Sequence, residues 1–176
     1  MIRETHMTDD VIVRARLGDE RTLAFIQTES WKSAFRGILS EEELIRCTSL
    51  EKTENMYQRL LEQQIGYGYI LEVQGKPHCI AWWNATREKD MPGYAELLCI
   101  HSLPGNWRKG YGSRMMEAVL RDMAMAGYRN VMLWVFEANE RARALYEAMG
   151  FVTRGKRKPG ITPTEICYER NLEETE

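Results

Sequence analysis

Hydrophobic periodicity changes several times along the chain, and the order of these changes constrains the fold more than any other feature. Alternating or continuous apolar runs predict strands at 11–17, 67–73, 78–86, 94–102, 130–136, 151–157 and 165–170. Apolar residues at helical spacing predict helices at about 19–37, from 40 onward, and at about 50–64, 110–126 and 139–149. This order predicts an α/β (α+β) domain with a mixed sheet and helices on both faces.

Length and composition indicate one ordinary globular domain spanning residues 1–176. One domain usually has roughly 100–200 residues, and the 176 residues show no internal repeat and no linker. Hydrophobic residues make up 44% and charged residues 28%, which excludes a largely disordered chain. The formal net charge of −2 gives no overall basic footprint, so we expect no nucleic-acid partner. Residues 1–10 are polar, and we expect them to be flexible.

Cysteine spacing and hydropathy place the chain among cytoplasmic proteins without a membrane span. Cys47, Cys79, Cys99 and Cys167 are far apart and form no C-x-x-C pair, so neither a zinc site nor a disulfide framework is expected. No segment has 18 consecutive apolar residues, and the first ten residues lack the apolar core of a secretory signal. We therefore expect free thiols in a reducing cytoplasm and no membrane partner.

The segment Leu103–Ser113, LPGNWRKGYGS, carries the strongest functional signal. It follows an apolar strand and opens a helix. Gly110 and Gly112 let the backbone approach a ligand closely, and a helix start offers free N–H groups with a partial positive charge. Arg108 and Lys109 add two full charges. The segment predicts a site for a phosphate or pyrophosphate, with a plain tight turn as the alternative.

Two common nucleotide motifs are absent from this segment. It does not match the G-x-x-x-x-G-K-S/T loop of ATP-binding proteins. The dinucleotide motif G-x-G-x-x-G fails because its third glycine position holds Met115. Sites for ATP and NAD are therefore disfavoured.

A second informative segment, Asn139–Phe151, reads NERARALYEAMGF. Asn139 is a good helix N-cap, and Tyr146 lies two turns further along the same face. Gly150 ends the helix and Phe151 starts the next element. Taken alone, this segment predicts a short amphipathic helix with a buried tyrosine.

Together, in this order and separated by one strand, the two segments resemble the GNAT superfamily of acyl-CoA-dependent N-acyltransferases. The first is similar to the family's pyrophosphate loop, Q/R-x-x-G-x-G/A, and the second to its helix N-x-x-A-x-x-L/F-Y-x-x-x-G-F. The resemblance covers about residues 93–171, and residues 29–39 also resemble the first-helix region of small bacterial members. One position departs from the family pattern, because Trp107 occupies the Gln/Arg slot; the neighbouring Arg108 could supply the charge.

The resemblance implies a GNAT-like domain whose mostly antiparallel sheet of about six or seven strands splays centrally to admit acyl-CoA. Residues 93–171 would form the acyl-CoA-binding and catalytic core, with acetyl-CoA as cosubstrate and no metal. The implied coenzyme contacts are the loop amides, the edge of the strand before the loop, and Asn139. By residue, the loop contributes Arg108, Lys109, Gly110, Tyr111, Gly112 and Ser113, and the strand edge contributes Ile100, His101 and Ser102.

The resemblance also implies catalytic roles. Tyr146 occupies the position of the family's catalytic tyrosine, which would act as general acid toward the departing thiolate. Glu96 is the only acid in its apolar strand and is the candidate base, acting through water, because the attacking amine must lose a proton; a structural ion pair or a contact with substrate charge is the alternative. Glu137 is a second candidate base. If the strand is regular, His101 faces away from Glu96 and has a structural role.

The acceptor should bind between the first two helices and the sheet. Trp31, Phe35, Trp82 and Trp83 are candidate walls, with core packing as the alternative for each. Trp82 and Trp83 are adjacent on a strand and face opposite ways, so at most one can line a given pocket; Trp83 is the one we assign to the substrate.

These features predict an N-acetyltransferase acting on a small-molecule amine, such as a polyamine, an amino acid or an aminoglycoside-like compound. Acetylation of a protein N-terminus or lysine, and acyl-CoA sensing without turnover, are the alternatives. Nucleic-acid binding through the basic residues 154–158 is disfavoured because interleaved aromatics are missing. Many members of the family pair as dimers, so the resemblance also allows a homodimer.

Overall fold

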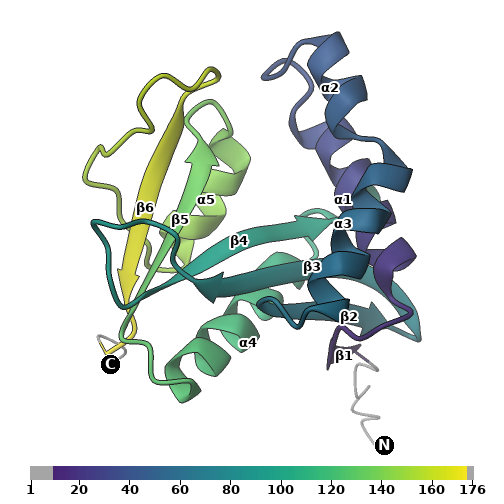
Figure 1. The fold of residues 1–176 in the computed structure, drawn as a ribbon, viewed down its shortest axis with the longest axis horizontal. Coiled ribbons are helices and arrows are strands. Elements are labelled where there is room, and N and C mark those ends of the chain that lie inside the picture. The colour runs from purple at the N-terminus through teal and green to yellow at the C-terminus, as the bar shows by residue number, and fades with distance from the viewer. Residues whose placement is uncertain (1–9, 174–176) are drawn as a thin grey trace, which may run out of the picture.

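Six strands hydrogen-bond in the order β1-β2-β3-β4-β5-β6 in the computed structural model, which describes residues 10–173 (Figure 1). The strands are β1 (Asp10–Arg14), β2 (Tyr67–Val73), β3 (Lys76–Ala85), β4 (Tyr94–Ser102), β5 (Asn130–Phe136) and β6 (Glu165–Asn171). The helices are α1 (Glu20–Ala34), α2 (Glu41–Cys47), α3 (Leu50–Glu62), α4 (Tyr111–Met125) and α5 (Glu140–Ala148), with a 3-10 turn η1 (Pro104–Asn106). The expectation of flexible residues 1–10 falls, apart from Asp10, outside the described residues.

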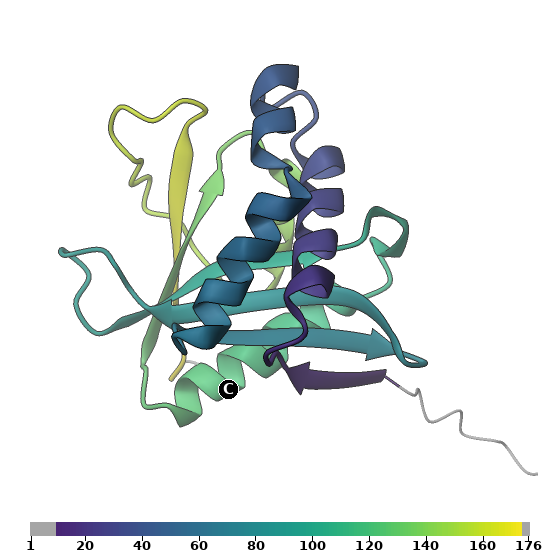
Figure 2. The ribbon, with the colours of Figure 1, turned by 45° about the vertical axis from the view of Figure 1, so that its right-hand side comes forward.

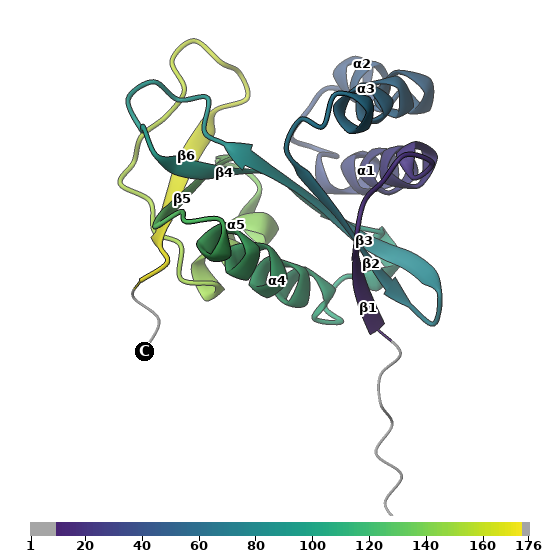
Figure 3. The same ribbon diagram turned by 60° about the horizontal axis from the view of Figure 1, so that its bottom comes forward.

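The sheet is mixed and mostly antiparallel, as predicted. Only β4 and β5 run parallel, and each other neighbouring pair is antiparallel. The helices α1 and α3 lie side by side on one face, which Figure 2 shows in purple and blue, and α4 and α5 cover the other face (Figure 3). No helix within residues 10–173 is long and apolar enough to cross a membrane.

Local side-chain contacts explain where the first helices begin. Ser40 and Glu43 form a capping box, since the Ser40 hydroxyl accepts from the Glu43 N–H and the Glu43 carboxylate accepts from the Ser40 N–H. Asp19 precedes α1, and its carboxylate accepts a hydrogen bond of 2.9 Å from the Arg16 N–H and does not cap the helix. The turn before α1 is therefore fixed by Asp19.

The parallel pairing of β4 and β5 is short, and the two strands then separate. Residues Tyr94–Leu97 pair with Asn130–Leu133, and the pairing stops there. Figure 1 shows β4 and β5 leaving their shared start in different directions. We call the opening between residues 98–102 of β4 and 134–136 of β5 the fork. It confirms the predicted central splay of the sheet.

A β-bulge in β4 changes which side chains face which helices. Trp83 pairs with Leu97 and Trp82 pairs with Cys99, so Leu98 is the extra residue. The bulge shifts the alternation by one, and Glu96 and His101 therefore lie on the same face of the sheet. The expectation that they face opposite ways assumed a regular strand and is wrong.

The predicted strand 151–157 does not form. Only two isolated bridges, Val152 with Glu169 and Arg157 with Ile166, connect this segment to the outer edge of β6. Between them the chain leaves the edge, and Gly155 has a positive φ of 81°. Phe151 alone is buried in this segment, so the alternating apolar face that would hold a regular strand in register is missing.

Candidate active site

The loop between β4 and α4 presents a row of backbone N–H groups without partners. Arg108 and Gly110 both have left-handed backbones, with φ of 62° and 81°, and Gly110 is the N-cap of α4. Within the described part of the chain, none of the N–H groups of residues 108–113 donates a hydrogen bond to the protein. These groups and the helix start form a cradle, which we define as residues 108–113, with the chemistry to hold a phosphate or diphosphate.

The edge of β4 at the fork offers further backbone groups. The Leu103 N–H donates to the His78 carbonyl at 3.0 Å, so Leu103 faces β3, and the backbone of His101 does so too because strand groups alternate. Ile100 and Ser102 therefore turn their N–H and C=O groups toward the fork. Ile100, His101 and Ser102 were the residues expected to bind a pantetheine arm. Of these three, His101 has its backbone N–H and C=O turned toward β3 and not toward the fork.

Close packing between α4 and α5 places the start of α5 beside the cradle. A Cβ atom built on Gly112 would lie 3.3 Å from Cδ2 of Leu145, so a glycine allows this close approach of the two helices. Asn139 is buried, and its side-chain oxygen accepts from the Ala142 N–H at 3.2 Å. Asn139 thus orders the start of α5, which is one of its two predicted roles.

Tyr146 lies in the core beneath the fork with a protonated phenol. Its side chain is 7% exposed, and its ring contacts Phe151 and Tyr168 with centroid distances of 6.0 and 6.4 Å. Burial raises the pKa of Tyr146 well above its usual range; Cys99 raises it further, and Arg141 opposes the shift. The phenol is therefore protonated at neutral pH. No acceptor for its hydroxyl occurs among residues 10–173.

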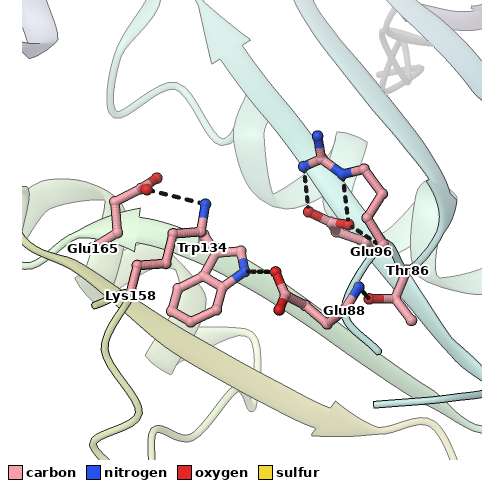
Figure 4. A network of polar contacts seen from close by, with 7 residues as sticks. Thr86, Glu88, Glu96, Trp134, Lys158 and Glu165 are labelled. Carbon is pink, nitrogen blue, oxygen red and sulfur yellow. Dashed lines mark hydrogen bonds and ion pairs between the residues drawn. The ribbon is translucent and has the colours of Figure 1, made fainter. Parts of the chain in front are cut away.

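Glu96 is held by Arg87 (Figure 4). Glu96 is 2% exposed, and its carboxylate accepts hydrogen bonds of 3.2, 3.2 and 2.7 Å from the Arg87 N–H, Nε and Nη2. The ion pair is one of the alternatives that the sequence left open for Glu96. Beside it, Trp134 donates to Glu88 at 3.0 Å and Lys158 pairs with Glu165 at 3.0 Å.

Aromatic side chains cover the α1 side of the fork. The Trp31 indole donates to Nε2 of His101 at 3.1 Å, and the ring of Phe35 lies 5.0 Å from that of Phe136 at the end of β5. Trp31 and Phe35 themselves pack edge to face, 5.0 Å apart. Burial, with a smaller contribution from Arg141, lowers the pKa of His101 to about 4, so this imidazole is neutral.

The two adjacent tryptophans of β3 both belong to the core. Trp83 is 1% exposed and faces α4, where its indole donates to the Tyr69 hydroxyl at 3.1 Å. The assignment of Trp83 to substrate binding is therefore wrong, because the bulky ring lies on the face opposite α1 and is enclosed there. Trp82 faces α1 and α3 but is also buried, and it donates to the Ile65 carbonyl.

Glu137, the second candidate base, pairs with Arg157, which lowers the pKa of this carboxyl. A surface hollow of about 560 Å³ lies between the end of α1 and α2, and neither Trp31 nor Phe35 lines it. The four cysteines are free, and no cluster of three His, Cys, Asp or Glu side chains suited to a metal occurs in residues 10–173.

Three residues of the candidate site were not predicted from the sequence: Arg87, Phe136 and Arg141. Phe136 and Arg141 lie beside motif positions, at a strand end and in the first helical turn after Asn139, which is a usable signal. Arg87 lies in a charged loop nine residues before Glu96, and nothing in that loop distinguishes it from Lys89.

Comparisons with known proteins agree with the fold. The model of the Acetyltransferase (GNAT) family matches residues 29–151. The crystal structure of the paia N-acetyltransferase from Thermoplasma acidophilum in complex with coenzyme A superposes with a TM-score of 0.75 and 20% identity, covering 92% of this chain and 98% of that one. That of yncA from Salmonella typhimurium with its cofactor acetyl-CoA gives a TM-score of 0.71 and 14% identity over 94% and 95% of the two chains. None of the curated proteins matches the chain.

Proposed function

The chain belongs to the GNAT acetyltransferase family, and on that basis we propose that it transfers an acetyl group from acetyl-CoA to the primary amine of a small acceptor, by direct attack in a ternary complex. One observation carries the proposal. The unbonded amides of the cradle follow β4 where it has separated from β5, and the protonated phenol of Tyr146 comes directly after Leu145, which contacts the cradle at Gly112.

The protein groups suit the anionic and amide parts of coenzyme A. The N–H groups of Arg108, Lys109, Gly110, Tyr111, Gly112 and Ser113 would hold the diphosphate, because they need acceptors and sit at a helix start. The backbone groups of Ile100 and the N–H of Ser102 would bind the pantetheine arm as an added strand binds a sheet edge, while the Ser102 carbonyl already accepts from the Trp107 indole. No step in this scheme needs a metal.

The chemistry needs an acid near the sulfur. As the amine nitrogen bonds to the acetyl carbon, the carbon–sulfur bond breaks and a thiolate leaves. The Tyr146 hydroxyl would give its proton to that sulfur, since a phenol is protonated at neutral pH.

The amine must also lose a proton, since a free alkylamine has a pKa of about 10 and is protonated at neutral pH. We propose Glu96 as the base, acting through water. A carboxylate offers about four acceptor positions, and Arg87 occupies three of them, which leaves one for a water. Arg87 would then position the carboxylate.

Trp31 and Phe35 are the side chains that we propose as the acceptor wall. They come from α1 and reach both arms of the fork, through His101 on β4 and Phe136 on β5. The acceptor would approach from this side, opposite α4 and α5. Polyamines, amino acids and aminoglycoside-like compounds are the acceptor classes to compare.

The test is a thiol-release assay with acetyl-CoA and a panel of amines, including a lysine peptide. Acetyl-CoA-dependent release that requires a small amine supports the proposal. Release only with the peptide would place the activity on proteins. Coenzyme binding without release for any amine would instead indicate a sensor and overturn the proposed catalysis.

A further inference from the structure

The tryptophan at position 107 is the one place where the phosphate loop departs from its family pattern, and its side chain has a defined place. The Trp107 indole N–H donates to the Ser102 carbonyl at 3.2 Å. This bond ties the ring to the free edge of β4, directly before the cradle. The side chain is therefore a fixed flat surface at the cradle's entrance.

A cation lies on that surface. The guanidinium carbon of Arg141, in the first turn of α5, is 3.5 Å from the centroid of the Trp107 ring. No carboxylate within residues 10–173 pairs with Arg141. Stacking occupies one face of the guanidinium and leaves its in-plane N–H donors available, which is the geometry that Arg uses to bind phosphate.

The packing of α5 aims Arg141 at the cradle. Leu145, four residues after Arg141, contacts Gly112 in the first turn of α4. Residues four apart share one face of a helix, so Arg141 and Leu145 both face the start of α4. The guanidinium thus lies across from the unbonded N–H groups of residues 108–113.

We infer that Arg141, held flat by Trp107, binds the diphosphate of coenzyme A and supplies the side-chain contact that the Gln/Arg of the family motif would give from position 107. The inference rests on the proposed function. On this inference the positive charge that binds the diphosphate comes from Arg141 on α5 and not from Arg108. The exposed side chain of Arg108 has no ion pair or ring contact within residues 10–173 that would hold it in place.

The first experiment compares Arg141→Gln with the wild type in two assays. Titration with coenzyme A should show binding weakened by about 10-fold to 100-fold, the size expected for losing charge-assisted hydrogen bonds. S-acetylpantetheine, which lacks the diphosphate, should react with a kcat/KM within about twofold of wild type. Arg121→Gln is the matched control, because Arg121 is exposed on α4 about 15 Å along the helix from the cradle.

The second experiment tests the platform. Trp107→Leu should weaken coenzyme A binding as Arg141→Gln does, and the double variant should lose little more, because both changes remove one contact. Trp107→Phe keeps an aromatic face and should bind more tightly than Trp107→Leu. Thermal unfolding without coenzyme checks that each variant is folded.

Three results would overturn the inference. They are unchanged coenzyme A binding in Arg141→Gln, equal losses with both acetyl donors, or a loss confined to Arg108→Gln. In each of these cases the wild type still binds coenzyme A, so the proposed function survives. A wild type that does not bind coenzyme A would instead remove the proposed function itself.

Discussion

Replacing His101 with glutamine should make the protein more resistant to acid than the wild type. Burial lowers the pKa of His101 to about 4 in the folded chain, while a histidine in an unfolded chain has a pKa of about 6.5. Above the unfolded value both states are neutral, and His101 costs nothing. As the pH falls below it, the unfolded chain binds the proton first, so stability is lost progressively down to the folded pKa.

The size of the effect follows from the shift. Between about pH 7 and about pH 4.5 the wild type should lose about 2 kcal/mol through His101 alone, approaching about 3 kcal/mol at lower pH. Glutamine does not titrate, and its side-chain oxygen can still accept the Trp31 indole N–H, which reaches Nε2 of His101 at 3.1 Å. The packing on α1 should therefore be retained.

The assay is urea unfolding of wild type and His101→Gln at both pH values. Carboxylates that titrate in the same range are present in both proteins and cancel in the comparison. We expect the free energy of unfolding of the variant to fall by about 2 kcal/mol less than that of the wild type. Equal losses in the two proteins would refute the burial of a neutral His101 against Trp31.

Three further variants test other parts of the account. Tyr146→Phe should lower kcat, measured by thiol release, by about 100-fold. Its affinity for coenzyme A, measured by calorimetry, should stay within about twofold of wild type. An unchanged kcat would show that Tyr146 is not the general acid. Arg87→Gln should lower the free energy of unfolding, measured by urea titration, by about 1–2 kcal/mol. The loss is smaller than for a fully buried ion pair because the Arg87 side chain is 70% exposed. An unchanged free energy of unfolding would show that Glu96 needs no partner. Gly68→Ala should lower the free energy of unfolding, measured by thermal unfolding, by about 1–3 kcal/mol, because the added Cβ would lie 2.3 Å from Cζ3 of Trp82. An unchanged stability would show that Trp82 can move aside.

Much of the fold follows from the sequence because local signals and burial agree. The strands Tyr67–Val73, Tyr94–Ser102 and Asn130–Phe136 begin and end where the apolar runs predict. The Ser40 capping box forms because both partners lie within one helical turn. The fork was predicted through the two motifs and their resemblance to a family, since strand separation has no signature in periodicity.

The errors arise where the decisive contact is distant in sequence. A continuous apolar run such as Leu97–Ile100 does not show which residue bulges, so the side of His101 could not be predicted. The choice between Trp82 and Trp83 as a pocket wall depended on which face of β3 packs against α1, and alternation along the strand does not show that. The partner of Glu96 comes from a loop, and the stacking of Arg141 on Trp107 joins residues in two different motifs.

Isothermal titration calorimetry of the full chain with acetyl-CoA and coenzyme A would show directly whether the cradle and the fork form a coenzyme site. We expect one site per chain with micromolar affinity for both ligands. Absence of binding at millimolar ligand would contradict this expectation, and the unbonded amides of residues 108–113 would then belong to a simple turn.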